Sequence, residues 1–211
     1  MADTGRAGRV RLERRLAVAE HGADLLDRKQ RILADELERL ELVAERSRGR
    51  WELSAREAAT WSRRAAELDG RERIEAAAAS IPARAEVEWA AAMGVEFPLE
   101  ARCVVGRSRG AAGSSALALA VGAHAEALEA AVEHAAASRA VLLLSEELAA
   151  TRSRQHAVEK RWIPRLEGRL AAVHRSVEEL ELEEGLRLRW AAGAAGAAAP
   201  GPGRAAQEGE P

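Results

Sequence analysis

The chain has few of the residues that build compact or disulfide-linked proteins. Its one cysteine, Cys103, cannot form an internal disulfide, which agrees with a reducing compartment. Aromatic residues make up 3% of the sequence, and no proline occurs before Pro82. Few large side chains are therefore available to fill a thick core, and no proline interrupts a helix over the long N-terminal segment.

Strong charge of one sign and long apolar runs are also missing. The formal net charge is −2 at pH 7, so no global basic field attracts nucleic acid. No apolar run approaches the ~18 residues that a membrane span requires, and the N-terminus has no apolar stretch typical of a signal peptide. We therefore expect no nucleic-acid partner, and we expect any link to a membrane to depend on partner proteins.

The residues that are abundant are those of long helices. Charged residues make up 31% of the chain, and alanine, leucine, glutamate and arginine dominate. From Leu12 onward, apolar residues recur at alternating spacings of four and three, an average of about 3.5 that indicates a left-handed coiled coil. A comparable pattern runs from Ala116 to Trp190. Because neither helix can bury its apolar stripe alone, we expect the two helices to fold back on each other.

The predicted fold class is mainly α, with two long antiparallel helices that form a coiled coil and a short β-hairpin between them. The expected segments are an N-terminal extension (1–8), a first coiled-coil helix (9–80), an insert with a hairpin and a flexible loop (81–114), a second coiled-coil helix (115–190) and a disordered tail rich in alanine, glycine and proline (191–211). The residues predicted for the seam of the coiled coil are Leu26, Leu33, Leu37, Leu40, Trp51, Trp61, Val158, Trp162, Leu166, Leu170 and Val173.

The insert changes from helical to alternating periodicity. Apolar and polar residues alternate over residues 85–91 and 95–99, which predicts two short strands that turn at Met93 and Gly94. A short helix over the alanines is the alternative. Because the insert breaks the helical period, we expect the hairpin to be dispensable for the helical pair. Ser114 or Ser115 is expected to cap the second helix.

Pro164 interrupts the second helix where the apolar spacing also changes. Trp162, Leu166 and Leu170 follow one another at intervals of four, which is a stutter in the coiled-coil repeat. Proline also deprives the carbonyl of Lys160 of its helical donor. The pattern predicts a helix bend at Pro164 rather than a break.

The sequence carries no recognisable motif for chemistry. Its glycine-rich stretch is not followed by Lys-Ser or Lys-Thr, and no two of its five histidines lie three or four residues apart. We therefore expect no catalytic residue, no cofactor and no metal site. A cluster of terminal arginines is either a solvated helix start or a contact for an acidic partner surface. The candidate contact residues, which an antiparallel pair would bring to one end, are Arg9, Arg11, Arg14, Arg15, Arg187 and Arg189.

Three separated segments resemble one protein family. Residues 9–40, RVRLERRLAVAEHGADLLDRKQRILADELERL, are similar to the N-terminal helix of the D subunit of V-type (A/V-type) ATPases. Residues 151–189, TRSRQHAVEKRWIPRLEGRLAAVHRSVEELELEEGLRLR, resemble its C-terminal helix, and MGVEFP at 93–98 resembles its hairpin turn and second strand. Residues 99–139 match the family weakly, and the tail is not part of its pattern.

The resemblance implies the role of a central-stalk, or rotor, protein. Such a protein transmits torque between a catalytic hexamer and an ion-driven membrane rotor, and so couples ATP synthesis or hydrolysis to the transport of hydrogen or other ions. It is not an enzyme by itself. The alternative interpretation of the residues is a generic coiled-coil scaffold or adaptor protein unrelated to ATPases.

The resemblance also implies partners and a location. The implied partners are the catalytic and non-catalytic hexamer subunits (A and B), the small F subunit, and a funnel-like adaptor subunit (C or d) above the membrane ring. The implied location is the cytoplasm, peripheral to the plasma membrane as part of the complex. The family's paired helix termini would turn inside the hexamer, where the terminal arginines would meet acidic loops.

Overall fold

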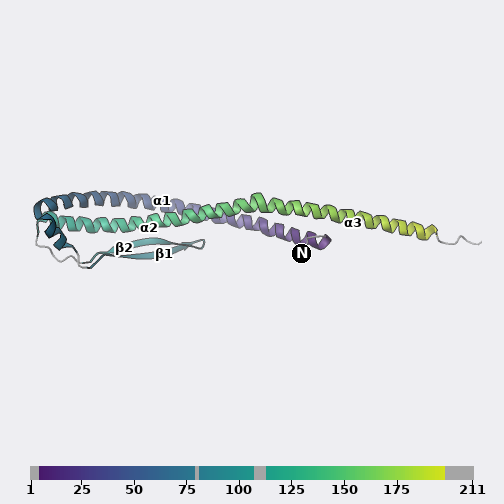
Figure 1. Ribbon diagram of the computed structural model, residues 1–211, viewed down its shortest axis with the longest axis horizontal. Coiled ribbons are helices and arrows are strands. Elements are labelled where there is room, and N and C mark those ends of the chain that lie inside the picture. The colour runs from purple at the N-terminus through teal and green to yellow at the C-terminus, as the bar shows by residue number, and fades with distance from the viewer. Residues whose placement is uncertain (1–4, 79–80, 107–112, 198–211) are drawn as a thin grey trace, which may run out of the picture. The chain divides into compact units, whose positions relative to one another are not determined.

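The described elements confirm the expected fold class. The computed structural model describes residues 5–78, 81–106 and 113–197. In chain order the elements are α1 (Gly5–Ala77), β1 (Arg84–Ala92), β2 (Val95–Val104), α2 (Ser115–Ala157), a π-helical turn η1 (Val158–Trp162) and α3 (Ile163–Ala197) (Figure 1). Parts of the expected N-terminal extension (1–4), first helix (79–80), flexible loop (107–112) and tail (198–211) lie outside the described residues.

Both long helices extend further at their ends than the sequence pattern indicated. Helix α1 begins at Gly5 rather than near residue 9, and α3 continues to Ala197 rather than ending near Trp190. The added C-terminal stretch is mostly alanine, which has the highest intrinsic helix propensity of all residues. Residues 191–197, whose composition suggested a disordered tail, therefore continue the helix to Ala197.

The contacts divide the chain into two units. We call Asp24–His156 the core unit, and Met1–Ala23 together with Ala157–Pro211 the terminal unit. In the core unit, Lys29 of α1 pairs with Glu147 of α2 at 2.7 Å, and Arg50 pairs with Glu133 at 2.6 Å. Residue numbers rise along one helix as they fall along the other, so the two helices are antiparallel.

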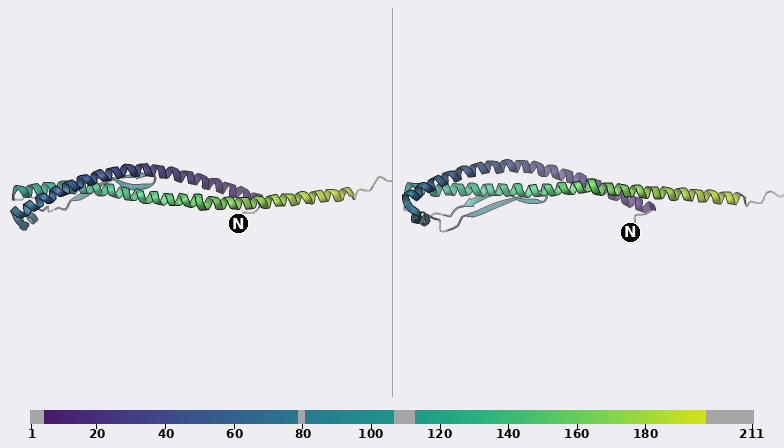
Figure 2. Two further views of the ribbon diagram at one scale, coloured as in Figure 1. Left: turned by 90° about the horizontal axis from the view of Figure 1, so that it is seen from above. Right: turned by 45° about the horizontal axis from the view of Figure 1, so that its top comes forward.

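The hairpin lies against the helical pair of the core unit (Figures 1 and 2). Phe97 of β2 is buried among Leu33 and Leu40 of α1 and Leu144 and Leu148 of α2. No residue of β1 is buried, so β1 is the outer strand. The strands pair antiparallel from Arg84 opposite Val104 to Ala92 opposite Val95, with one irregularity that leaves Leu99 of β2 as an extra residue.

The turn of the hairpin lies at Met93 and Gly94, as predicted. Their φ angles are 50° and 84°. Two successive residues with positive φ define the two-residue turn whose twist matches that of the flanking strands. The paired strands exclude the alternative of a short helix over the alanines.

Helix α1 changes direction at Gly70, which the sequence analysis did not anticipate. Gly70 has φ 75° and ψ 168°, a conformation open almost only to glycine, so the one helix expected over residues 9–80 is interrupted there. Figures 1 and 2 show the last turns of α1 hooking away from the preceding helix. A small apolar cluster of Ala65, Ala77, Ala116, Leu117 and Ala120 closes this end of the core unit.

Asp69 joins this bend to the start of α2. Its carboxylate accepts a hydrogen bond from the Ser114 backbone N–H at 2.8 Å and another from the Ser114 hydroxyl. The Ser114 oxygen in turn accepts from the backbone N–H of Leu117 at 3.3 Å, so Ser114 caps α2. These bonds, with Arg73 nearby, hold the pKa of Asp69 below its usual value.

Pro164 follows a widened turn rather than a helix break. The backbone N–H of Ile163 donates to the carbonyl of Val158, five residues earlier, and the backbone stays helical from Ala157 to Ile163. Proline supplies no N–H, and its ring conflicts with the carbonyl four residues earlier in an α-helix. A π turn before Pro164 relieves that conflict by adding one residue to the turn. A bend at this position stays a prediction.

One property of the second helical stretch differs from the sequence-based expectation. By length and composition, Ser115–Gly193 contains a window apolar enough to cross a membrane, and 33% of that window is buried within the protein. The stretch is rich in alanine, which forms an apolar surface without long runs of large residues. The core helix of a protein that does not cross a membrane meets the same criterion.

Candidate interaction site in the terminal unit

Two contacts set the register of the helices in the terminal unit. Arg6 of α1 pairs with Glu181 of α3 at 2.9 Å, and Glu13 lies 3.9 Å from the imidazole of His174. Leu12 and Leu166 are fully buried between these helices. The start of α1 therefore lies beside the part of α3 near Glu181.

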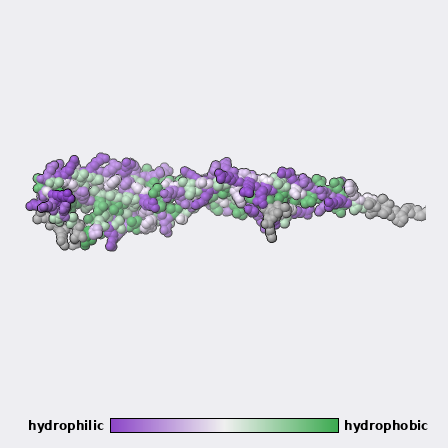
Figure 3. Space-filling view, viewed as in Figure 1, coloured by the Kyte–Doolittle hydropathy of each residue, from purple (hydrophilic) through white to green (hydrophobic). Residues whose placement is uncertain are grey.

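Helix α3 continues well beyond the start of α1. From Glu181 to Ala197 it extends by roughly 24 Å at 1.5 Å per residue, past the register position of Gly5. Leu182, Leu186 and Trp190 lie on one face of this extension because they are spaced by four. Trp190 is 78% exposed and Leu182 is 67% exposed. Figure 3 shows apolar surface among the charged side chains along this end of the molecule.

The arginines of α1 differ in their exposure and in the contacts they make. The guanidinium of Arg15 lies over the ring of Trp162 on the facing helix, 5.7 Å from its centroid, and this contact covers part of an apolar ring. Arg9 is half-buried, with its Nε 3.4 Å from the Glu13 carboxylate. Arg11 and Arg14 are exposed. Part of the predicted arginine cluster therefore packs within the protein.

Arg187 and Arg189 do not lie beside the arginines of α1. Because Arg6 lies opposite Glu181, both residues belong to the extension of α3. Arg187 pairs with Glu183 one turn earlier at 3.5 Å, and the Arg189 Nε donates to the carbonyl of Gly185 at 3.4 Å. The structure therefore separates the predicted cluster into two groups along the terminal unit.

The predicted seam residues differ in burial. The buried ones are Leu33, Leu40 and Leu166; the half-buried ones are Leu26, Leu37, Trp61, Val158, Leu170 and Val173; and the exposed ones are Trp51 and Trp162. Trp51 is 38% exposed and stacks on His134 of α2 with ring centroids 5.5 Å apart. The large rings lie at the margin of the seam, and leucines and alanines fill its centre.

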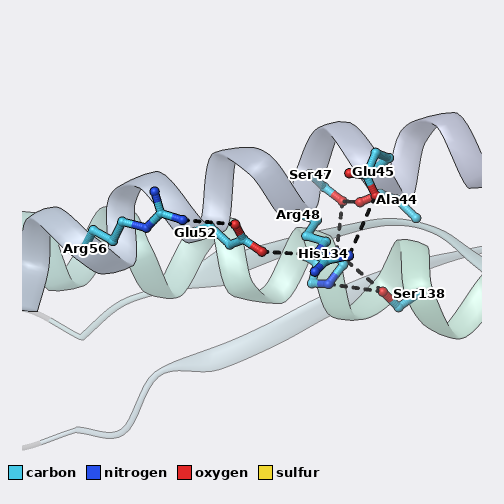
Figure 4. Close-up of polar contacts among 8 residues, drawn as sticks. All are labelled: Ala44, Glu45, Ser47, Arg48, Glu52, Arg56, His134 and Ser138. Atoms are coloured by element: carbon cyan, nitrogen blue, oxygen red, sulfur yellow. Dashed lines mark hydrogen bonds and ion pairs between the residues drawn. The ribbon is translucent and has the colours of Figure 1, made fainter.

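His134 belongs to a polar layer across the seam of the core unit (Figure 4). Its Nδ1 lies 3.3 Å from the hydroxyl of Ser47 on α1, and the hydroxyl of Ser138 lies 3.4 Å from the same ring. The Ser47 hydroxyl donates to the carbonyl of Ala44 at 2.9 Å. With its hydrogen used there, the Ser47 oxygen is left to accept from the imidazole N–H.

Further polar contacts tie the two helices of the core unit at several levels. The hydroxyl oxygen of Ser62 lies 2.6 Å from Nε2 of His124. Near the other end of the unit, the side chains of Gln30 and Gln155 form a hydrogen bond. The Lys29 ammonium donates to Glu147 and holds the pKa of that carboxyl below its usual value. Sliding one helix along the other would leave these groups unpaired, so the contacts favour one register.

Sequence reasoning missed these cross-helix pairs because periodicity identifies a seam but not the partners across it. It also missed an apolar hollow of about 460 Å³ in the core unit, lined in part by Ile74, Val105, Leu117 and Val121. Within the described ranges, no group of three or more His, Cys, Asp or Glu side chains could hold a metal ion.

Comparison with known proteins gives one consistent result. The family model for the D subunit of ATP synthase matches residues 9–193 of the chain. The D subunit of the V-type ATP synthase of Anaeromyxobacter dehalogenans (strain 2CP-C) is 31% identical over 198 residues, which cover 89% of this chain and 94% of that protein. The protein of the same description from Anaeromyxobacter sp. (strain K) is 30% identical over the same shares of both chains.

Proposed function

Because the chain belongs to the D-subunit family of V-type ATP synthases, we propose that it is the central-stalk rotor protein of such a complex. In this role it transmits torque between a catalytic hexamer and an ion-driven membrane rotor. Its own residues perform no catalysis. The observation that carries the proposal is the series of cross-helix contacts at successive levels of the core unit.

Torque transmission requires that two helices resist bending and sliding together. A single helix can bend, and two helices that slide past each other store little elastic energy. The ion pairs of Lys29 with Glu147 and of Arg50 with Glu133 join α1 to α2 at separate levels. Each exposed pair contributes only about 0–1 kcal/mol, but several of them oppose the same sliding motion.

The extension of α3 suits a position inside a ring of subunits. A lone helix is about 10–12 Å wide with its side chains, so it fits an opening that would exclude a pair. Leu182, Leu186 and Trp190 offer apolar surface that makes no directional hydrogen bonds. We propose that this surface turns within the hexamer of A and B subunits, where non-directional contacts permit rotation.

The exposed arginines provide a second kind of contact. Arg11 and Arg14 on α1, and Arg187 on α3, would pair with acidic loops of the hexamer. Arginine keeps its charge when partly desolvated and pairs with carboxylates in a bidentate geometry. Such pairs are weak enough at a surface to exchange from one loop to the next. The remaining proposed partners are the F subunit and the adaptor subunit, and the proposed location is the cytoplasmic face of the membrane.

Reconstitution of the purified chain with a hexamer of A and B subunits tests this proposal. Replacing the exposed Arg11, Arg14 and Arg187 together with glutamine is expected to weaken hexamer binding at low salt, and the difference from wild type is expected to shrink at high salt. A matched control replaces three exposed arginines of the core unit, Arg63, Arg139 and Arg152, with glutamine. Both variants should keep the helical circular dichroism of the wild type.

Two results would contradict the proposal. If the terminal and core-unit variants bound hexamer equally well at low salt, the arginine contact would be absent. If the tagged wild-type chain, purified from its native membrane, carried no nucleotide-binding subunits, the rotor role itself would be wrong and a general scaffold would explain the coiled coil better.

A further inference from the structure

The outer edge of the hairpin is an open strand edge within the described residues. Strand β1 pairs with β2 on one side, and no described strand pairs with its other side. The backbone N–H and C=O groups of alternate residues therefore point outward along a strand of nine residues. Such an edge is a template for another strand. We propose that β1 receives an extended segment of a partner protein in which basic and apolar side chains alternate.

The geometry of β1 keeps this edge regular. The extra residue of the hairpin, Leu99, belongs to β2, so β1 itself carries no extra residue and its open edge is continuous. Pro98, which cannot donate a backbone hydrogen bond, also lies in β2. Strand β1 contains neither proline nor lysine, two residues that commonly protect an edge strand from pairing.

The side chains of β1 determine which strand would fit. Glu86 and Glu88 lie on one face of the strand, and Val87 and Trp89 lie on the other. Trp89 is 60% exposed and Val87 is 42% exposed. Lysine or arginine opposite the glutamates and an apolar residue opposite Val87 or Trp89 would form favourable cross-strand pairs. On the same face Glu100 of β2 lies opposite Glu88, whereas Arg102 lies opposite Glu86 and 3.9 Å from Glu100, so the acidic surplus is centred on Glu88.

The same charges disfavour pairing with a second copy of the chain. In two registers of an antiparallel pair of β1 strands, Glu88 would face Glu88 or Glu86, whereas registers that place Arg84 opposite Glu86 or Glu88 pair opposite charges. Like charges directly opposite each other destabilise a strand pair. The two glutamates therefore oppose self-association in the first two registers and favour a basic strand as the partner. Figure 3 shows apolar surface in the region of the hairpin, bordered by charged side chains.

The full-length chain and synthetic peptides provide the test. A labelled nine-residue peptide that alternates lysine with valine or threonine is titrated against the chain, and binding is followed by fluorescence anisotropy. Hydrogen exchange of the β1 amides is measured with saturating peptide. We expect binding together with slower exchange of those β1 amides that do not bond to β2. A peptide with the same charge but two prolines is expected to bind at least about tenfold more weakly, because it cannot complete the ladder.

A charge reversal distinguishes strand recognition from general attraction. Glu86→Lys together with Glu88→Lys is expected to weaken binding of the basic peptide roughly fivefold or more, and to permit binding of a peptide that alternates glutamate with valine. The matched control, Glu178→Lys with Glu179→Lys, makes the same change in net charge on α3 and should bind the basic peptide like the wild type. All four positions are exposed, so folding should persist in both variants.

Three outcomes would overturn the proposal. Unchanged exchange of the β1 amides at saturating basic peptide would show that no strand is added. Equal affinity for the proline-containing peptide would reduce the contact to charge attraction. Protection of β1 that rises with the concentration of the chain alone, with a dimer in sedimentation, would assign the edge to a second copy.

Discussion

Two glycines of α1 are expected to respond in opposite ways to the same substitution. Gly70 has φ 75° and ψ 168°, whereas Gly49 lies in the uninterrupted helical part of α1. A Cβ atom added at either position would meet no other atom within 4 Å, so neither substitution creates a clash. The difference between the two sites therefore comes from the backbone alone.

The expected magnitudes follow from the two conformations. Gly70→Ala forces a non-glycine residue into a region that glycine occupies almost alone, at a cost of about 1–3 kcal/mol in the free energy of unfolding. Gly49→Ala removes a flexible residue from a helix interior and should stabilise the protein by about 0.5–1 kcal/mol. The two variants should thus differ by roughly 1.5–4 kcal/mol although their chemical change is identical.

Urea denaturation followed by circular dichroism measures both values. The slope of the free energy of unfolding against urea concentration should equal the wild-type slope in both variants, because neither substitution changes the surface that is exposed on unfolding. If Gly70→Ala were as stable as Gly49→Ala, α1 would continue straight through residue 70. The contact between Asp69 and Ser114 would then also require another explanation.

Three further predictions concern the core, the cap and the π turn. Phe97→Ala should lower the free energy of unfolding by about 3–5 kcal/mol, and Leu99→Ala, at a 41% exposed position of the same strand, by much less. An equally small effect of both substitutions would show that the hairpin is dispensable for the fold, as its sequence suggested. The pKa of Asp69 is lowered in the folded state, so its contribution to stability is present above the unfolded pKa of about 3.9 and is lost as pH falls through the folded pKa. The stability difference between wild type and Asp69→Asn should therefore be largest near pH 7 and shrink in denaturation experiments below about pH 4, and a difference independent of pH would exclude the ionised cap. Pro164→Ala should change the free energy of unfolding by no more than about 1 kcal/mol, since the regained hydrogen bond and the more flexible unfolded chain oppose each other, but it should alter ATP turnover in the assembled complex; unchanged turnover would show that the proline is merely tolerated.

The sequence predicted those features that repeat or that depend on local turn chemistry. Leu33, Leu40 and Leu166 lie on the predicted stripe and are buried, and such positions can be recognised because a coiled-coil seam imposes the same period over many turns. The change to alternation around Met93 and Gly94 located the hairpin, since a period of two fits only a strand. The fold class could be derived from these patterns alone.

Single positions were harder to predict because one residue hardly changes a period. Gly70 lies inside a helical pattern, and the signal that could have revealed it is the dipeptide Asp69-Gly70, which is typical of turns and helix ends. The docking of Phe97 on the helices could not be predicted, because nothing in the sequence of the hairpin states which face of the helical pair it covers. The separation of Arg187 from the arginines of α1 depended on where α1 begins relative to α3, which periodicity does not fix.

The π turn and the stutter in the second helix explain each other. Val158, Trp162, Leu166 and Leu170 are spaced by four where the repeat requires one step of three, so the stretch contains one residue too many for its turns. In a regular α-helix that surplus residue would have to be absorbed by unwinding the supercoil, as the sequence alone suggested. The π turn at Val158–Trp162 instead holds the additional residue within one wide turn. Leu166 and Val177 are buried after it, as Leu148 is before it, so the apolar stripe continues on the side that packs. Pro164 favours the π turn indirectly. Because proline has no backbone N–H, it cannot form the α-helical hydrogen bond to the carbonyl of Lys160 that would compete with the wide turn.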